Sequence, residues 1–365
     1  MSERRGGAMS LLYSDVEEEL RGTVRRVLTD RAPWTAVLKR TESDEPYDQV
    51  LWRTLAAEVG VAALPVPETF DGAGASWREV AVVAEELGRA VAPVPYLGAA
   101  TATAALLELE DDLLRAVAAG ERTAVLAVPL STGPTPTPPV SVRADGGTLT
   151  GTVTSVADAL TADVLLVFAD DALYAVDAAA VTRTPILSLD LTRRLADVTF
   201  EAAPARRLAA GEPARVAWER AWRAGAVLLA GEQLGIAGWC LETTVGYVKT
   251  RHQFGRPVGS FQALKHRLAE LWVAVTQARA VARYAAGCLA GGDPDLAVAA
   301  SLAQAHCGPV AVRAAEECVQ LHGGIAMTWE HPAHLYLKRA KSDAIAFGTA
   351  ERHRAALAGL VDISS

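Results

Sequence analysis

YVKTRHQFGRPVGSFQALKHRLAEL, residues 247 to 271, breaks a long helical pattern. We predict that the helix stops at Phe254-Gly255-Arg256-Pro257 and restarts at Ser260-Phe261-Gln262, because glycine and proline interrupt helices. The break places glycine beside arginine and glutamine, which lets a backbone approach a diphosphate closely and hydrogen-bond it. For this segment alone, helix caps beside a solvated charged face are the simpler explanation.

A second segment has the same combination of residue types. CVQLHGGIAMTWEHPAHLYLKRAKSDA, residues 318 to 344, ends a helix on His322-Gly323-Gly324 and continues with lysine and arginine. Alone, it too is explained by a capped helix, so the argument depends on the two segments together.

The pattern around these segments divides the chain into three parts. Residues 14 to about 120 repeat apolar residues at helical spacing, and long helices return from Pro213 onward. Between them, residues 121 to about 205 contain short β-branched strands: TAVLAVPL, GTLTGTVTSV, DVLLVFA and ALYAVD. We therefore predict an α+β fold with an N-terminal helical domain at 1–120, a middle β-domain at 121–208 and a C-terminal helical bundle at 209–365.

The first helix of the predicted bundle has a seam of small residues on one face. Steps of three and four residues keep the seam on that face and let a neighbouring helix approach closely. The seam consists of Ala217, Ala221, Ala224, Leu228, Gly231, Gly235 and Gly238.

The composition of the chain argues against several classes of protein. Lys and Arg number 35 against 43 Asp and Glu, a formal net charge of -8, which argues against binding nucleic acid through phosphate neutralisation. The four cysteines match neither a zinc site nor a disulfide framework. The N-terminus lacks the pattern of a signal peptide, and the apolar stretches are broken before membrane-spanning length. We predict a cytoplasmic protein with reduced thiols and without a membrane partner.

Common catalytic and binding motifs are absent from the sequence. The paired glycines follow helical segments, so they match no dinucleotide fingerprint, and no Walker motif or GxSxG elbow is present. EHPAH brings Glu330, His331 and His334 together, but it lacks the HExxH order and Pro332 interrupts the register. We predict no metal site there and interpret these histidines as loop or interface residues.

Taken together, the two glycine-containing segments closely resemble the acyl-CoA dehydrogenase family. RHQFGRPVGSFQALKHRLAE resembles its Arg-x-Gln-Phe-Gly … Phe-Gln stretch, and QLHGGIAMTWEHPAHLYLKRA resembles its Gln-x-x-Gly-Gly stretch. LWRTLAAEVGVAALPVPETFDGAGASWREVAVVAEELGRA is similar to its N-terminal helical region. The resemblance spans nearly the whole chain in the correct order. It implies an N-terminal helical domain, a middle β-domain and a C-terminal four-helix bundle.

The resemblance implies an FAD-dependent oxidoreductase that dehydrogenates an acyl-CoA thioester across its α and β carbons. In that family a carboxylate takes the α-proton, the β-carbon delivers hydride to the flavin, and an electron-transferring flavoprotein accepts the electrons. Family members are usually tetramers, built as dimers of dimers with FAD bridging a dimer interface.

The same resemblance implies which residues of this chain contact FAD. Arg251, Gln253, Phe254, Gly255 and Gln262 would hold the diphosphate and adenosine end of the neighbouring subunit's cofactor. Gln320, Gly323 and Gly324 would supply the opposing contacts, and Thr349 and Glu351 would complete a Gly-Thr-x-Glu/Gln motif. Arg251 offers phosphate a fork of donors, and the glycines leave room for the backbone.

The position of the catalytic carboxylate departs from the family pattern. Many members have Glu directly before the Gly-Thr pair, where this chain has Phe347, and Phe cannot accept a proton. A subset carries the base on the first long helix of the bundle, which aligns near Gly225. The nearest carboxylates, Glu219 and Glu232, lie roughly 1.7 to 1.9 turns away. Glu232 is a weak candidate for a relocated base and is better explained as a surface or interface carboxylate.

The predicted β-domain departs from the pattern as well. PLSTGPTPTPP, residues 129 to 139, replaces the family's Thr-Glu-Pro … Gly-Ser-Asp loop beside the flavin and substrate. Ser155 and Ala157 stand where an aromatic residue and a Thr or Ser usually line the flavin ring. The losses therefore lie on the flavin-ring side, while the adenosine side is retained.

This asymmetry leads to three hypotheses. The first is the partner subunit of a heteromeric acyl-CoA dehydrogenase in lipid or steroid catabolism, which lacks its own catalytic Glu and pairs with a homologous catalytic chain. Some bacterial members of the family work as such α2β2 heterotetramers, and SLDLTRRLADVTF resembles the actinobacterial group. The alternatives are a complete dehydrogenase that uses Glu232 as its base, and a non-redox scaffold in a biosynthetic pathway.

Overall fold

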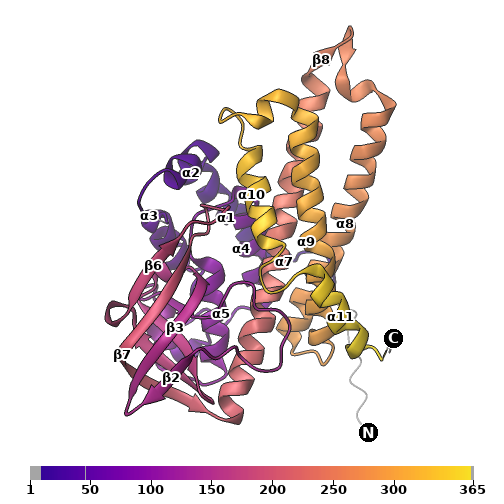
Figure 1. The fold of residues 1–365 in the computed structure, drawn as a ribbon. Helices are drawn as coiled ribbons and strands as arrows, with labels where there is room; N and C mark the ends of the chain where they lie inside the picture. Colours follow the sequence, from indigo (N-terminus) through magenta and orange to yellow (C-terminus); the bar gives the residue numbers. More distant parts are fainter. Residues whose placement is uncertain (1–9, 46, 363–365) are drawn as a thin grey trace.

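The computed structural model describes residues 10–45 and 47–362 (Figure 1). Its first part is helical, and polar caps set where the main helices begin. Ser14 and Glu17 form a capping box at the start of α1, and Ser76 and Glu79 form another at the start of α4. The helices are α1 (Asp15–Arg31), α2 (Trp34–Thr41), α3 (Gln49–Arg53), α4 (Trp77–Ala90), α5 (Tyr96–Leu107) and α6 (Leu113–Ala118).

The middle part of the chain is a seven-stranded sheet that closes on itself. The strand order is β1-β4-β2-β3-β7-β5, and a further pairing of β4 with β5 closes a small barrel, while β6 pairs with β7. A separate apolar core fills it, including Leu149, Leu165 and Phe200. The strands are β1 (Ala124–Leu126), β2 (Val142–Asp145), β3 (Thr148–Ala157), β4 (Val164–Ala169), β5 (Ala172–Asp177), β6 (Thr182–Ile186) and β7 (Leu195–Ala210).

Three of these strands were not among the four predicted from sequence. β2 and β6 are short and lie largely open to solvent, so they lack the apolar signal of a buried strand. β7 carries an alternating pattern only in its first half, and its second half is rich in alanine and arginine. Pairing with β3, β5 and β6 holds it extended along its length.

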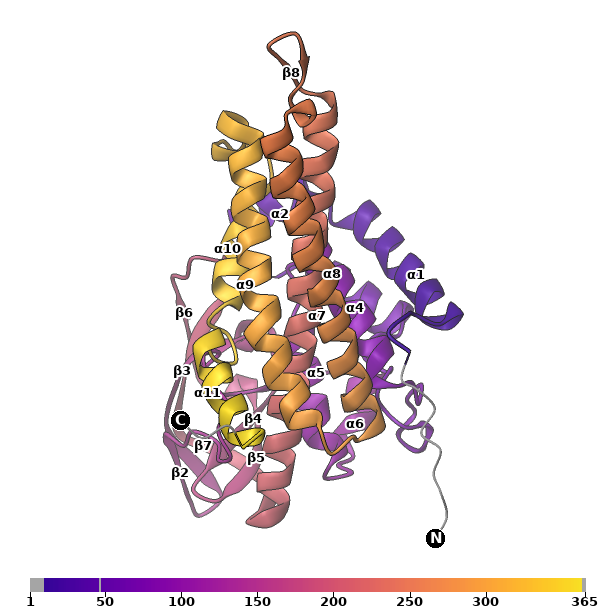
Figure 2. The ribbon, with the colours of Figure 1, turned by 90° about the vertical axis from the view of Figure 1, so that its right-hand side faces the viewer.

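The last part of the chain is a helical bundle (Figure 2). The long helices α7, α8 and α9 lie side by side, with α10 and α11 against α9. A short hairpin of β8 (His252–Gln253) and β9 (Arg256–Pro257) connects α7 to α8 at one end, as the glycine break predicted. The helices are α7 (Glu212–Thr250), α8 (Gln262–Gly291), α9 (Leu296–His322), α10 (Ala333–Asp343) and α11 (Ala350–Leu360).

Helix α7 is the central element of the bundle. By length and composition it is apolar enough to span a membrane, yet 89% of its most apolar 18-residue window is buried inside the protein. This burial identifies α7 as the core helix of the fold. Its apolar character comes from packing against helices on several sides, including α4, α5, α8 and α9.

Two glycines of the small-residue seam of α7, Gly231 and Gly235, face α4. A Cβ atom on Gly235 would overlap the backbone oxygen of Glu85, and one on Gly231 would lie 3.2 Å from the backbone oxygen of Ala81. A Cβ atom on Gly88 of α4 would likewise overlap the backbone oxygen of Glu232. Gly238 differs from the rest of the seam, because an added Cβ there meets no atom within 4 Å.

The seam predicts opposite outcomes for two glycine substitutions in the same helix. Gly235→Ala should lower the free energy of unfolding by about 1 to 3 kcal/mol, because the added methyl group overpacks the contact with α4. Gly238→Ala, the matched control, should leave stability unchanged or raise it by up to about 1 kcal/mol through helix propensity. Chemical denaturation measures both. Equal effects of the two variants would contradict the close approach of α7 to α4.

Candidate functional site

Several of the positions at which the chain departs from the family pattern line one small pocket, here called the inter-domain pocket, although Ser155 and Gly225 do not. It lies where the N-terminal helices, the barrel and the bundle meet. Phe347 and Ala157 both line it, and so does the segment after β1 that begins the Pro/Thr loop. The remaining lining residues are Leu97, Gly98, Thr101, Leu126, Val128, Pro129, Leu130, Thr132, Asp158, Trp218 and Trp222.

Phe347 points at Gly225 of α7. A Cβ atom built on Gly225 would overlap ring atoms of Phe347 and would lie 3.1 Å from the hydroxyl oxygen of Thr101. The two positions at which the family pattern would place a catalytic carboxylate are therefore in direct contact here, and both lack one. The ring fills the notch that the missing side chain of Gly225 leaves.

The backbone around Phe347 is held in place by several contacts. Phe347 has a φ of 55°, an unfavourable left-handed conformation for an aromatic residue. Its N–H donates to the carbonyl oxygen of Leu130 at 2.7 Å, and its carbonyl oxygen accepts from Nε2 of His353 at 3.0 Å. Burial lowers the pKa of His353, which stacks on Trp222. These contacts over-determine the turn and fix the direction of the Phe347 ring.

The Pro/Thr loop packs over the same place. The indole N–H groups of Trp222 and Trp218 donate to the carbonyl oxygens of Thr132 and Thr135 at 3.0 and 3.2 Å. A Cβ on Gly348 would lie 2.8 Å from the Cα of Gly133, so the loop and the Phe347 turn touch backbone to backbone. The loop that replaces the family's flavin-side loop therefore closes this pocket.

The inter-domain pocket is too small for a flavin ring or an acyl chain. Its volume of about 30 Å³ holds at most a few water molecules, whereas ligand pockets span roughly 300 to 1,000 Å³. The lining is mostly apolar, and Phe347, Trp218 and Trp222 supply its bulk. The residues that line this pocket therefore leave no room inside it for the isoalloxazine ring of FAD.

Asp158 is the one titratable side chain that lines the inter-domain pocket, and sequence reasoning did not identify it. Its carboxylate accepts from the hydroxyl of Tyr47 and, at 2.9 Å, from the backbone N–H of Gly98. Burial raises the pKa of Asp158. Asp158 directly follows Ala157, the last position of the family pattern in this strand, and Tyr47 lies 111 positions away in sequence, so no local pattern indicates this pair.

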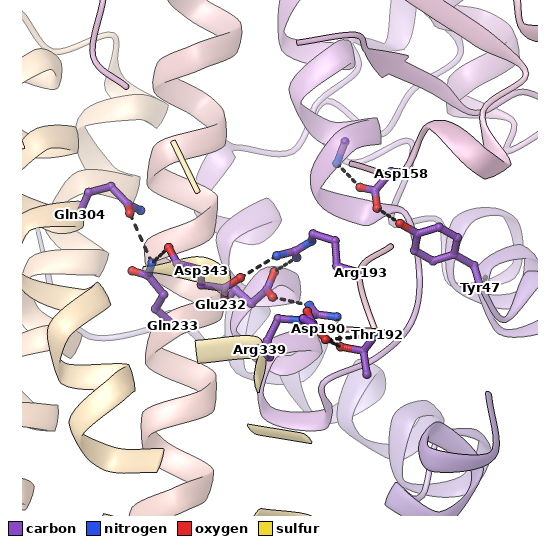
Figure 3. A network of polar contacts seen from close by, with 11 residues as sticks. Tyr47, Asp158, Asp190, Thr192, Arg193, Glu232, Gln233, Gln304, Arg339 and Asp343 are labelled. Carbon is purple, nitrogen blue, oxygen red and sulfur yellow. Dashed lines mark hydrogen bonds and ion pairs between the residues drawn. The ribbon is translucent and has the colours of Figure 1, made fainter. Parts of the chain in front are cut away.

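Glu232 belongs to a buried ion-pair network near the junction of the three domains (Figure 3). One carboxylate oxygen accepts from Nη2 of Arg193 at 2.5 Å and the other from Nη1 of Arg339 at 2.5 Å. The side chain is about 5% exposed, so the expected surface or interface location is wrong. Burial alone would raise the pKa of Glu232, but the two guanidinium groups outweigh that effect and hold the pKa below its usual value. A carboxylate whose pKa is lowered by two neighbouring guanidinium groups is a poor proton acceptor.

Two further carboxylates complete the network. Asp343 of α10 accepts from Arg193 at 2.8 Å, and Asp190 of the β6–β7 loop pairs with Arg339 at 2.6 Å. Burial, and then the nearby charge of Glu232, raise the pKa of Asp343 well above its usual value. The network thus ties the SLDLTRR segment before β7 to both α7 and α10. That segment, noted in the sequence only for its resemblance, brings Asp190, Thr192 and Arg193 into the core.

The residues expected at the adenosine side gather at the other end of the molecule, here called the bundle tip. Phe254 and Gly255, with φ of 55° and 74°, form the turn of the β8–β9 hairpin. Tyr247 of α7 packs its ring 4.4 Å from that of His322, which directly precedes Gly323. The two glycine-containing segments therefore lie side by side. The bundle tip consists of Arg251, Gln253, Phe254, Gly255, Gln262, Gln320, Gly323 and Gly324, and all are exposed.

Thr349 and Glu351 do not lie at the bundle tip. They are at the start of α11, beside the Phe347 turn, and Figures 1 and 2 both place α11 at the opposite end of the bundle from β8. Thr349 precedes the first residue of α11 and Glu351 is exposed. One molecule therefore presents two separate groups of the expected cofactor contacts.

The histidines of the EHPAH segment lie close to the bundle tip. The His331 ring is 4.2 Å from that of His322, and the His334 ring is 4.7 Å from that of Trp329. Burial, followed by the neighbouring charge of His322, lowers the pKa of His331 to about 4. Within residues 10–45 and 47–362, no group of three or more His, Cys, Asp or Glu side chains is arranged to hold a metal ion.

Comparison with known proteins shows the family. The model for the acyl-CoA dehydrogenase N-terminal domain matches residues 14–112, and the model for its C-terminal domain matches residues 215–360. The chain belongs to the acyl-CoA dehydrogenase family, a family of oxidoreductases that bind FAD. The α+β architecture predicted from the sequence is confirmed by this match and by the structure.

The chain is similar to several individual acyl-CoA dehydrogenases of mycobacteria. The chain is 38% identical to acyl-CoA dehydrogenase IpdE2 of Mycolicibacterium smegmatis over 338 residues, which covers 92% of this chain and 95% of that protein. It is 36% identical to acyl-CoA dehydrogenase FadE34 of Mycobacterium tuberculosis, over 90% of this chain but 45% of that protein. A chain of the ChsE4-ChsE5 complex from Mycobacterium tuberculosis superposes with a TM-score of 0.84 at 28% identity, covering 98% of this chain and 100% of that one.

The ion-pair network predicts a pH-dependent loss of stability in a Glu232 variant. Glu232→Gln should lower the free energy of unfolding by about 3 kcal/mol at neutral pH, because it leaves two buried guanidinium groups short of a partner. The lowered pKa of Glu232 means that its contribution is present above the unfolded value of 4.5 and is lost as the pH falls below it. The deficit of the variant should therefore shrink in acid. Urea denaturation from neutral to acidic pH measures it.

Glu219→Gln is the matched control on the same helix. Glu219 pairs with Arg215 and Arg223, with about a quarter of its side chain exposed, so its removal should cost less than about 1 kcal/mol. A Glu232 deficit no larger than that of Glu219, or one independent of pH, would contradict a structural role for Glu232.

Proposed function

We propose that this chain is the cofactor-binding partner subunit of a heteromeric acyl-CoA dehydrogenase and that a homologous chain supplies the catalytic carboxylate. The single observation that carries the proposal is the contact of Phe347 with Gly225. Both positions that the family uses for a base are occupied by groups that cannot accept a proton, and the ring of Phe347 fills the space between them.

The bundle tip would contribute the chain's part of the FAD site. Arg251 is exposed and presents its guanidinium at the end of α7, where a diphosphate could accept from it. Gln253, Gln262 and Gln320 offer amide donors nearby, and Gly323 and Gly324 leave backbone accessible at the end of α9. FAD supplies the hydride-accepting chemistry when bound, and these side chains would hold its diphosphate and adenosine end.

The expected FAD contacts of this chain form two groups that lie far apart, and this separation supports an FAD site shared between two chains. Thr349 and Glu351 lie at the opposite end of the bundle from Arg251, so one bound FAD would need the tip of one chain and the α11 region of another. In this chain the pocket beside α11 does not fit the flavin ring. The functional site would therefore combine the tip of this chain with the open ring pocket of a homologous partner.

Two relatives support a paired arrangement. FadE34 aligns with this chain over 45% of its own length, as a protein built from two such units would. ChsE4-ChsE5 is by its name a complex of two different chains. By this analogy we infer a heterotetramer in the cytoplasm that acts on an acyl-CoA of lipid or steroid catabolism. Its electrons would pass to an electron-transferring flavoprotein.

Expression of the chain alone and together with a homologous catalytic subunit tests the proposal. Alone, the purified protein should carry little FAD and show no substrate-dependent bleaching of the flavin absorbance. The co-purified complex should carry FAD and be bleached by its acyl-CoA substrate. Stoichiometric FAD with full activity in the lone protein would reject the partner role, and a complex without any flavin would favour a non-redox scaffold.

A substitution at the bundle tip tests where this chain holds the cofactor. Arg251→Gln in the co-expressed complex should lower FAD occupancy about tenfold or more, because a charge-assisted contact to phosphate is lost. Arg313→Gln is the control, since Arg313 of α9 pairs with Glu270 at the surface away from the tip. Equal FAD content in both variants would exclude Arg251 from the cofactor site.

The relocated-base alternative makes a different prediction for Glu232. If Glu232 is structural, a folded complex that carries Glu232→Gln retains substrate-dependent bleaching at a temperature well below its unfolding transition. Loss of bleaching with FAD still bound and the fold intact would instead identify Glu232 as the base.

A further inference from the structure

A second and larger cavity lies away from the inter-domain pocket and shares no lining residue with it. It has a volume of about 280 Å³ and lies between α1, α2 and α4 of the N-terminal domain and α7 and α10 of the bundle. This volume is close to the lower end of the range for small-molecule sites. None of the expected FAD contacts and none of the residues of the ion-pair network lines it.

The walls of this cavity are aromatic. Trp239 of α7 and Tyr336 of α10 are stacked, with ring centroids 3.6 Å apart and planes 3° from parallel. The hydroxyl of Tyr336 donates to the backbone oxygen of Arg89 at 2.7 Å, which fixes its ring. Trp34 of α2 is partly exposed and adds a third aromatic side chain. A flat or apolar ligand body would find rigid, preformed surfaces here.

The polar groups of the cavity are donors in excess. Its carboxylate, Glu86, is 1% exposed, and both of its oxygens accept from Nε and Nη2 of Arg25 at 2.8 and 2.6 Å. Arg89 contacts Glu242 at the rim through Nη2. Among the residues that the structure describes, none accepts a hydrogen bond from Nη1 of Arg25 or from Nε and Nη1 of Arg89, although the charges of Glu85 and Glu242 also lie near Arg25. The acceptor capacity is thus used inside the protein, while guanidinium donors remain free.

Two indole groups add to this excess of donors. Within residues 10–45 and 47–362, the indole N–H groups of Trp34 and Trp239 donate to no other residue, as is also true of Trp77, Trp272 and Trp329, so both are open to a ligand. Such a wall favours a ligand that accepts hydrogen bonds and carries negative charge, because free guanidinium and indole donors match carboxylate, sulfonate or phosphate oxygens.

We propose that this cavity binds a small organic anion with a flat, apolar body. The ring system would pack against Trp34 and Trp239, and the anionic group would accept from Arg89 and Arg25 at the mouth. The site is independent of the proposed partner role, because it uses no residue of the bundle tip or of the inter-domain pocket. Carboxylate, sulfonate and phosphate share the recognition chemistry, so the ligand class is defined by charge and planarity.

Titration of the full-length protein, alone or in its complex, with 2-naphthoate tests the proposal by isothermal calorimetry. We expect saturable binding with a dissociation constant on the order of 1 mM or tighter. The neutral isostere 2-naphthamide should bind about tenfold or more weakly, because it lacks the charge. Naphthoate bound no better than the amide, or no saturation up to the solubility limit, would overturn the proposal.

Substitutions locate the binding. Arg89→Gln and Trp34→Ala should each weaken naphthoate binding about tenfold, since one removes the free donors and the other a wall of the cavity. Arg26→Gln is the control, because Arg26 is an exposed arginine of the same domain outside the cavity. Circular dichroism confirms that the variants fold. Unchanged affinity in both cavity variants would overturn the assignment to this site.

Discussion

Helix α7 packs against α4 so closely that backbone meets backbone. Glycine on both helices permits this contact, because Gly235 faces the backbone of Glu85 and Gly88 faces the backbone of Glu232. The contact fixes how far the N-terminal helices stand from the bundle, and it fixes the rotation of α7 about its axis. That rotation directs Glu232 toward Arg193 and Arg339, and about two turns earlier it directs Gly225 toward Phe347.

The ion-pair network and the inter-domain pocket are consequences of the same placement. The network uses charges from the loop before β7, from α7 and from α10, so its formation aligns the barrel with the bundle. Four carboxylates, including Asp158, lie near the guanidinium groups of Arg193 and Arg339. Burial raises the pKa of Asp158, and burial followed by the charge of Glu232 raises the pKa of Asp343. In the ion-pair network, the charges of the carboxylates and guanidinium groups are therefore neutralised by one another inside the protein and not by solvent.

The sequence predicted the order of helical and β parts because periodicity is a local property, and it predicted the break between α7 and α8 because glycine and proline act locally. It also identified Phe347 and Gly225 as altered positions, but only the fold shows that the two touch. Asp158 and its partner Tyr47 were missed, since they meet across 111 positions of sequence. Glu232 was expected at the surface, because a helix with a weak apolar face gives no local sign that two distant arginines bury a carboxylate.

The arrangement of retained and lost residues follows from where each group lies in the fold. Residues at the bundle tip are exposed and make few contacts within the chain, so the fold itself does not require Arg251 or Gln253. Phe347, by contrast, lies at the junction of three domains, where the Pro/Thr loop, Trp222 and Gly225 are mutually adjusted to its ring. Filling such a pocket stabilises the subunit, since it replaces a cavity with packed side chains. The proposed partner role accounts for both features, because such a subunit would need the donors of its exposed tip but not an open pocket at the junction of its own domains.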